Sequence, residues 1–301
     1  MNGAVLQSLP TSAAEAARLA ARLDVPAHII KVHRFPDDEL SVTVAPAATT
    51  TIIYASLDHP NDKLLAVLFT AEALRRAGAK RLVLVAPYLC YMRQDAAFHD
   101  GEAISQKAIG RLLAGNFDRV VTVDAHLHRT KDIHDVFPGI DADNLSAMPA
   151  IAEALRASSV DPATVVVGPD EESRPWVADL ARRLDLQHTV ARKTRRSDRS
   201  VAISFADPAL FARRPALLID DIVSSGGTLT TCAKALLAAG AATIDAVVTH
   251  ALFPPELVRT LFEAGIRSVR SSDSVPHPTN AIMLDGILAG ALAMEAMGAT
   301  P

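Results

Sequence analysis

ALLIDDIVSSGGT, residues 216–228, carries the clearest structural signal in this chain of 301 residues. The side chains from Ala216 to Ile219 are apolar, and two carboxylates and a short loop of serines and glycines follow them at once. A continuous apolar run that stops at polar residues is typical of a strand buried on both faces of a parallel sheet. The Ala- and Leu-rich residues that follow, as far as Leu237, predict a helix. The stretch therefore predicts a strand, a loop and a helix, the repeating unit of α/β proteins.

The loop has the composition of an anion-binding site. Gly226 and Gly227 allow backbone conformations that side chains forbid, so the N–H groups of residues 224–228 can point into one concavity. The N-terminus of the following helix favours a negative charge at the same place. Ser224 belongs to the same loop, and Ser225 and Thr228 add hydroxyl donors. These features predict a phosphate cradle.

Two carboxylates, Asp220 and Asp221, lie directly beside this predicted cradle. They would repel a phosphate unless they face something else, such as the vicinal hydroxyls of a ribose or a Mg²⁺ ion. A sugar phosphate satisfies the whole pattern. A plain strand-to-helix turn with a helix cap would leave two adjacent carboxylates at the end of a buried strand poorly explained.

Other apolar runs have the same layout and end in polar clusters. In open α/β sheets, ligands bind outside the carboxyl ends of the strands, so these clusters are expected at one site in each sheet. The runs are residues 81–86, 120–123 and 165–167, followed by residues 87–95, residues 124–126 and Asp170 respectively. Further strands are predicted at residues 29–32, 40–44 and 51–55, and a helix at residues 61–77, ended by Gly78. Ser12 followed by Glu15 predicts a capping box for a first helix.

Composition sets the class of protein. Half of the residues are hydrophobic, only 4% are aromatic, and the formal net charge is -4. This mix predicts an α/β protein of two domains, at residues 1–146 and 147–301, with a C-terminal helix at residues 284–297 that can pack on either domain. The charge excludes a nucleic-acid partner. Two distant cysteines, no apolar run of membrane-spanning length and no visible secretory signal predict a cytoplasmic protein.

The segment at residues 216–228 resembles the phosphoribosyl-diphosphate loop of type I phosphoribosyltransferases and of ribose-phosphate diphosphokinases. Three further segments resemble the second family: RFPDDEL at residues 34–40, YMRQD with GEAIS at residues 91–105, and VTVDAH at residues 121–126. The four motifs are colinear and span most of the chain. The resemblance implies two tandem type I phosphoribosyltransferase-like domains, each a parallel sheet flanked by helices. It also implies transfer of a diphosphoryl group from ATP to ribose 5-phosphate.

The resemblance further implies a role for individual residues, with Mg²⁺ as cofactor, ATP and ribose 5-phosphate as partners, and a homo-oligomer (dimer or hexamer) that completes the adenine site across a subunit interface. The implied residues are Lys193 and Arg195 for catalysis; Phe35, Asp37, Glu39, Arg93, Gln94 and Asp95 for ATP; Asp220, Asp221, Ser224, Ser225, Gly226, Gly227 and Thr228 for ribose 5-phosphate; and His126 and Asp170 for the metal.

Without the resemblance, several of these residues have plainer interpretations. His126 would be a structural histidine at a strand end, Phe35 a core side chain, and residues 191–199 a charged surface hairpin rather than a mobile flap. The chain also departs from the usual family pattern at three places. Asp38 stands where glycine is usual, and residues 127–130 and 171–173 replace glycine-containing stretches.

Other functions stay open at this point. A phosphoribosyltransferase would explain the loop at residues 220–228 but not the motifs of the N-terminal half. A non-catalytic homologue that regulates a partner enzyme would be expected to lack Lys193 and Arg195, yet both are present. An enzyme of the same class could use another nucleotide or a related ribose ester, because the departures cluster around the expected phosphates and metal.

Overall fold

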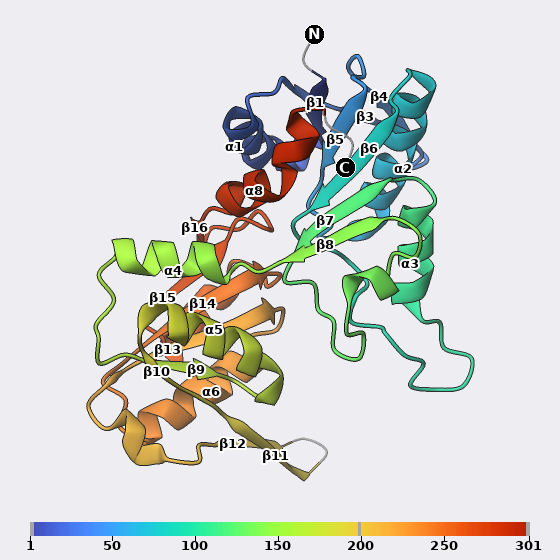
Figure 1. Cartoon of the computed structure of the whole chain (residues 1–301). Coiled ribbons are helices and arrows are strands. Elements are labelled where there is room, and N and C mark those ends of the chain that lie inside the picture. Colours follow the sequence, from blue (N-terminus) through green and yellow to red (C-terminus); the bar gives the residue numbers. More distant parts are fainter. Residues whose placement is uncertain (1–2, 198–199, 299–301) are drawn as a thin grey trace. The chain divides into compact units, whose positions relative to one another are not determined.

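The computed structural model describes residues 3–197 and 200–298, with side chains described outside residues 193–202. The chain forms two compact units. Unit 1 comprises Met1–Ser146 and Leu284–Pro301, and unit 2 comprises Ala147–Met283. Each unit has a six-stranded parallel sheet with helices packed against it (Figure 1). The predicted α/β class with parallel sheets is confirmed.

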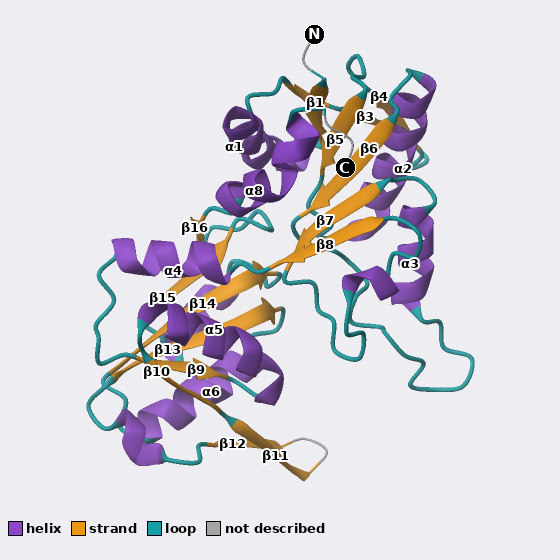
Figure 2. Ribbon diagram, viewed as in Figure 1, coloured by secondary structure: helices purple, strands orange, loops and turns teal. Residues whose placement is uncertain are grey.

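The sheet of unit 1 has the strand order β2-β1-β5-β6-β7-β8. Its central strands are short runs of apolar residues that are almost wholly buried, because helices cover both faces (Figure 2). A separate antiparallel hairpin, β3 (Lys31–Arg34) with β4 (Leu40–Thr43), packs on α2. The strands are β1 (Ala4–Ser8), β2 (Ala27–Ile29), β5 (Thr50–Tyr54), β6 (Arg81–Ala86), β7 (Arg119–Val123) and β8 (Asp141–Leu145), and the helices are α1 (Ala13–Leu23), α2 (Pro60–Arg76), α3 (Ser105–Ala114) and α8 (Asp285–Ala296).

The sheet of unit 2 has the strand order β10-β9-β13-β14-β15-β16. Its core packs Leu218 and Val248 of the two central strands against Leu236 of α6, and each of these side chains is at most 1% exposed. An antiparallel hairpin, β11 (Arg192–Ser197) with β12 (Ser200–Ser204), extends from this sheet. The strands are β9 (Val165–Gly168), β10 (Gln187–Val190), β13 (Pro215–Val223), β14 (Thr243–Ala251), β15 (Ser268–Ser272) and β16 (Asn280–Ile282), and the helices are α4 (Met148–Ala157), α5 (Arg174–Leu184), α6 (Gly227–Ala238) and α7 (Leu257–Glu263).

Most of the predicted elements are found, and two local predictions are wrong. The helix predicted at residues 61–77 is α2, and Gly78 follows it in the left-handed region with φ of 99°. The predicted strand at residues 29–32 is interrupted at Ile30, where the chain leaves the main sheet and begins β3. The capping box is also wrong, because the Ser12 hydroxyl accepts a hydrogen bond from the Ser56 backbone N–H at 3.1 Å instead of capping α1.

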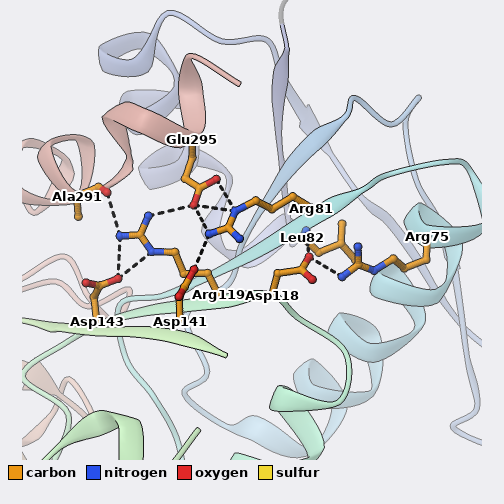
Figure 3. A network of polar contacts seen from close by, with 9 residues as sticks. All are labelled: Arg75, Arg81, Leu82, Asp118, Arg119, Asp141, Asp143, Ala291 and Glu295. Atoms are coloured by element: carbon orange, nitrogen blue, oxygen red, sulfur yellow. Dashed lines mark hydrogen bonds and ion pairs between the residues drawn. The ribbon is translucent and has the colours of Figure 1, made fainter. Parts of the chain in front are cut away.

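The last helix, α8, belongs to unit 1. The sequence-based division assigned residues 147–301 to the second domain, with a C-terminal helix that can pack on either one. Glu295 of α8 is 1% exposed and lies between Arg81 of β6 and Arg119 of β7 (Figure 3). Asp141 and Asp143 of β8 accept hydrogen bonds from the same two arginines at 2.9 and 2.8 Å. These ion pairs fix α8 to the sheet at the first residues of β6, β7 and β8. Within residues 3–197 and 200–298, no helix is both long and apolar enough to cross a membrane.

Candidate functional site

The loop between β13 and α6 has the geometry of an anion cradle. Gly226 has φ of 69°, and a Cβ built there would lie 2.6 Å from Leu257 Cδ2. A larger residue would therefore be disfavoured both by its backbone conformation and by a clash with Leu257. Gly227 begins α6, and a Cβ built there would make only an ordinary contact, 3.8 Å from Ser225 Oγ. A cavity of about 70 Å³ lies at this loop, with room for a group several times larger than a water molecule. Its walls come from residues 222–229 and from Asp220.

Asp220 lies close to two other carboxylates, those of Asp221 and Asp170. Burial raises the pKa of Asp220 well above its usual value, and the nearby charges of Asp221 and then Asp170 raise it further. Backbone N–H groups compensate in part, since Asp221 N donates to Asp220 Oδ1 at 3.1 Å and Ile222 N donates to Asp221 Oδ1 at 2.8 Å. A cluster of this kind is stabilised by hydroxyl donors or by a cation.

Asp170 approaches this cluster from the end of β9. Its Oδ1 accepts a hydrogen bond from Ser173 N at 3.3 Å, and its carbonyl accepts one from Ser173 Oγ at 2.6 Å. This pair closes a 3-10 turn at Glu171–Ser173. A Cβ at Gly168 would lie 2.0 Å from Ser173 Oγ, so glycine is required for the close packing of the turn. The ends of β9 and β13 therefore hold three carboxylates beside the phosphate cradle, within unit 2.

A larger cavity of about 340 Å³ lies at the opposite edge of the same sheet. It is lined in part by Pro215, Thr243 and Ser268, the first residues of β13, β14 and β15. Volume alone would place the functional site there. The arrangement of the carboxylates and the glycine loop favours the carboxyl edge, which is also where ligands bind in open parallel sheets.

Arg93, Gln94 and Asp95 lie in unit 1, in the loop that follows β6. Arg93 is exposed, and Gln94 donates to the Ala96 carbonyl at 3.3 Å. Asp95 differs from its neighbours because its side chain is only 1% exposed, and it accepts hydrogen bonds from Arg129. The carboxylate of Asp95 is therefore buried and paired with Arg129, whereas the side chain of Arg93 is exposed.

His126 lies at the end of β7, also in unit 1. The turn before it is fixed by Asp124, which has φ of 37° and donates its N–H to the Leu145 carbonyl at 2.8 Å. Ala125 N donates to Asn144 Oδ1 at 2.8 Å. The ring of His128 lies nearly parallel to that of His126, with 6.4 Å between the ring centroids. The predicted metal pair is thus divided between the units, with His126 in unit 1 and Asp170 in unit 2.

The three residues expected at the adenine lie at the turn between β3 and β4. Phe35 is 42% exposed and stacks edge-on against His33, with ring centroids 4.7 Å apart. The interpretation of Phe35 as a core side chain is therefore wrong. Asp37 and Glu39 are exposed in the same turn, and Asp38 adopts φ of 70°.

Lys193 and Arg195 lie in β11, in register with Ile203 and Val201 of β12. Residues 192–197 of the basic stretch thus form a strand that pairs antiparallel with β12. The side chains of Lys193 and Arg195 lie outside those that the structure describes, so their predicted catalytic role stays a prediction.

The donors at the site fit a metal ion that arrives with a substrate. No group of three or more His, Cys, Asp and Glu side chains in the described part of the chain is arranged to hold a metal by itself. Mg²⁺ commonly takes one or two protein carboxylates and completes its shell with water and phosphate oxygens. Asp170, with Asp220 and Asp221 nearby, supplies donors of this kind, whereas the imidazole of His126 is a less usual ligand for this ion.

One residue of the site was missed by the sequence reasoning. Arg129 belongs to residues 127–130, which the sequence marked only as a departure from the family pattern. The signal in the sequence is the arginine itself, whose planar guanidinium can pair with a carboxylate. Its partner Asp95 is 34 positions away in the sequence, so no local pattern connects them.

Comparisons with known proteins agree with this architecture. Residues 4–115 match the model of the N-terminal domain of ribose phosphate pyrophosphokinase, and residues 143–255 match the phosphoribosyl transferase domain. The crystal structure of phosphoribosylpyrophosphate synthetase from Mycobacterium smegmatis superposes with a TM-score of 0.84 at 24% identity, covering 97% of this chain and 98% of that one. The prediction of two tandem phosphoribosyltransferase-like domains is confirmed.

Sequence relatives give the family. The ribose-phosphate pyrophosphokinase of Methanopyrus kandleri is 33% identical over 263 residues, which cover 87% of this chain and 89% of that protein. The ribose-phosphate pyrophosphokinase of Brucella melitensis is 32% identical over 270 residues, covering 88% and 84%. The resemblance carried by the four sequence motifs is therefore confirmed, and the chain belongs to the ribose-phosphate pyrophosphokinase family, also called the ribose-phosphate diphosphokinases.

Proposed function

We propose that this protein is a ribose-phosphate diphosphokinase. It transfers the diphosphoryl group of ATP to the anomeric hydroxyl of ribose 5-phosphate, and it releases AMP and 5-phospho-α-D-ribose 1-diphosphate. The observation that carries the proposal is the edge of unit 2 at which a glycine-dependent anion cradle adjoins Asp220 and Asp221. Membership of the family supports the reaction. Its proposed place of action is the cytoplasm, with no nucleic-acid or membrane partner.

Ribose 5-phosphate would bind through two sets of groups. Backbone N–H groups of residues 224–228 and the hydroxyls of Ser225 and Thr228 would hold the 5-phosphate. Asp220 and Asp221 would accept hydrogen bonds from the ribose hydroxyls. Since burial disfavours the charged form of Asp220, hydrogen-bond donors on the sugar would stabilise that charge and favour binding.

ATP would be held by groups of unit 1 and by the β3–β4 turn. Arg93 can hold phosphate oxygens through its planar fork, and Gln94 offers an amide to the adenine edge. Phe35 offers an exposed ring for stacking on adenine, with Asp37 and Glu39 as polar contacts. We infer that this turn serves the site of a neighbouring subunit, so that activity requires a homo-oligomer.

The chemical step needs alignment and charge neutralisation more than covalent help from the protein. The C1 hydroxyl oxygen of ribose attacks the β-phosphorus in line and its proton passes to solvent. The bond from the β-phosphorus to the oxygen it shares with the α-phosphorus breaks, and AMP leaves with the bonding electrons. Lys193 and Arg195 in the β11–β12 hairpin would neutralise charge on the transferring phosphates, and closure of the hairpin would exclude water as a competing nucleophile. Bound Mg²⁺ would supply further charge neutralisation and orient the ATP phosphates. Asp170 of unit 2 would supply a carboxylate ligand, and His126 of unit 1 stays a predicted ligand.

The reaction is tested with purified protein, Mg²⁺, ATP and ribose 5-phosphate, by measuring AMP and the diphosphate sugar by chromatography. We expect AMP release that depends on the sugar and falls by at least a hundredfold in Lys193→Ala. The matched control is Arg76→Ala, which removes an exposed cation of α2. Release of AMP without the sugar, or binding of both substrates without turnover, would contradict the proposal.

Sharing of the site between subunits is tested by mixing two inactive variants, Phe35→Ala and Arg93→Ala. In a symmetric dimer, random assortment gives about half heterodimers, each with one intact site and one doubly altered site. Activity of about a quarter of the wild-type value is then expected after mixing. No recovery in a mixture that has exchanged subunits would show that both residues serve the same subunit's site.

A further inference from the structure

The loop after β7 is tied to the loop after β6 by Arg129. Its guanidinium Nη1 donates to Asp95 Oδ1 at 2.8 Å, and its backbone N–H donates to Asp95 Oδ2 at 2.9 Å. Both oxygens of one carboxylate are thus held by a single residue. Charge-assisted contacts with both carboxylate oxygens are among the strongest hydrogen bonds in proteins.

Burial distinguishes this ion pair from the surface pairs of the molecule. The side chain of Asp95 is 1% exposed, while that of Arg129 is 51% exposed. Burial by itself would raise the pKa of Asp95, but the hydrogen bonds from Arg129 and its charge outweigh that effect, so the pKa lies below its usual value. Removing Arg129 would leave a nearly buried carboxylate without its cation, which is costly compared with loss of an exposed pair.

Two further contacts extend the connection between the loops. The Arg129 guanidinium lies over the ring of Phe98, 5.1 Å from the ring centroid. Thr130 Oγ1 donates to Gln106 Oε1 at 2.8 Å, and Gln106 N in turn donates to the Gln94 carbonyl at 3.1 Å. Arg129 and its neighbour therefore contact both ends of the segment that contains Asp95.

We propose that Arg129 is a positioning residue that clamps the loop at residues 93–106 through Asp95 and so fixes the backbone from which Arg93 and Gln94 reach the nucleotide. Arg93 and Gln94 immediately precede Asp95, so its anchoring limits how far they can move. The same clamp connects this loop to the strand end that bears His126. The role assigned to the nucleotide rests on the proposed function, whereas the ordering of the loop does not.

The clamp requires arginine rather than any cation. A lysine at position 129 would keep the charge and the backbone contact, but it would lose the planar group that bonds Asp95 and lies over Phe98 together. Arg129→Lys is therefore expected to restore part of what Arg129→Ala removes. A residue that served only as a surface charge would be replaced fully by lysine.

The first experiment measures steady-state kinetics for wild type, Arg129→Ala, Arg129→Lys and the control Arg76→Ala. We expect Arg129→Ala to raise the KM for ATP by about tenfold or more and to leave the KM for ribose 5-phosphate within about twofold, with Arg129→Lys between. The control is expected to match wild type. Equal increases in both KM values, or none, would overturn the positioning role.

The second experiment measures hydrogen exchange at residues 93–104 in the absence of substrates, so it does not depend on activity. Exchange about tenfold faster in Arg129→Ala than in wild type or Arg76→Ala is expected, and unchanged exchange would overturn the clamp.

Asp95→Asn and the double variant Asp95→Asn/Arg129→Ala complete a double-mutant cycle for the same measurement. If Arg129 acts through Asp95, the double variant resembles the worse single variant, whereas additive effects would show that Arg129 acts independently. A wild-type protein without sugar-dependent AMP release would overturn the proposed function and leave the exchange result to decide on the clamp.

Discussion

Replacing Glu295 with glutamine should loosen the C-terminal helix α8 from unit 1. Glu295 is 1% exposed, and it accepts hydrogen bonds from Arg81 at 2.7 and 2.8 Å and from Arg119 at 3.1 Å (Figure 3). Its bonds to Arg81 are the largest reason why the pKa of that guanidinium is raised. Glutamine keeps the shape and one acceptor oxygen but removes the charge.

The magnitude follows from the burial of the three groups. Arg81 and Arg119 are each 15% exposed, and removing one partner from a buried ion pair costs roughly 3–5 kcal/mol. Asp141 and Asp143 remain as partners of the two arginines, although they are 57% and 37% exposed and so compensate only in part. We therefore expect the lower limit, about 3 kcal/mol, which is a factor of about 150 in the equilibrium for opening of α8.

Hydrogen exchange followed by mass spectrometry of residues 285–296 measures this equilibrium directly. The matched control is Glu72→Gln, which removes the acidic partner of Arg76 in a pair whose side chains are 63% and 73% exposed. Such exposed pairs contribute little, so the control should exchange like wild type. A change in α8 below about fivefold, or an equal change in every peptide of unit 1, would refute the reasoning, because α8 would then not open as a separate element.

Other predictions concern the site itself. Gly226→Ala should destabilise the protein by about 1–2 kcal/mol because of its positive φ and should weaken ribose 5-phosphate binding. Gly227→Ala, whose Cβ would meet no close neighbour, should leave the urea unfolding midpoint unchanged. Asp220→Asn should stabilise the ligand-free protein by about 0.5–2 kcal/mol, measured by calorimetry, because it removes a charge that burial disfavours, and should abolish sugar binding. The stabilising contribution of Asp95 should be present above pH of about 4 and be lost as the pH falls through its lowered folded-state pKa. The difference in urea midpoint between wild type and Asp95→Asn should therefore shrink as the pH falls below about 4.

The sequence was most informative where structure is determined locally. The strand, loop and helix at residues 215–238 follow from an apolar run, two glycines and the helix pattern, all within one segment. Because every strand of the two main sheets is parallel, strand ends in the sequence also predict which side chains gather at the carboxyl edge of each sheet.

Local sequence pattern was wrong or left the outcome open where a distant group takes part. The capping box at Ser12 was lost because Ser56, 44 positions later, offers its N–H to the same hydroxyl. The placement of α8 depends on the pairing of Glu295 with Arg81, which are 214 positions apart. Neither partner can be identified from one sequence, because both contacts exist only after the sheet has formed.

The three departures from the family pattern divide into two kinds. Asp38 keeps the positive φ that glycine would accept, since aspartate tolerates the left-handed region, and the Phe35 N–H still closes the turn on the Glu39 carbonyl at 2.8 Å. At Glu171–Ser173, hydrogen bonds from Ser173 to Asp170 hold the turn. At these two places the replacements maintain a backbone shape, whereas Arg129 adds an ion pair that glycine could not make. We therefore expect Arg129, rather than Asp38 or residues 171–173, to account for properties in which this protein differs from its relatives.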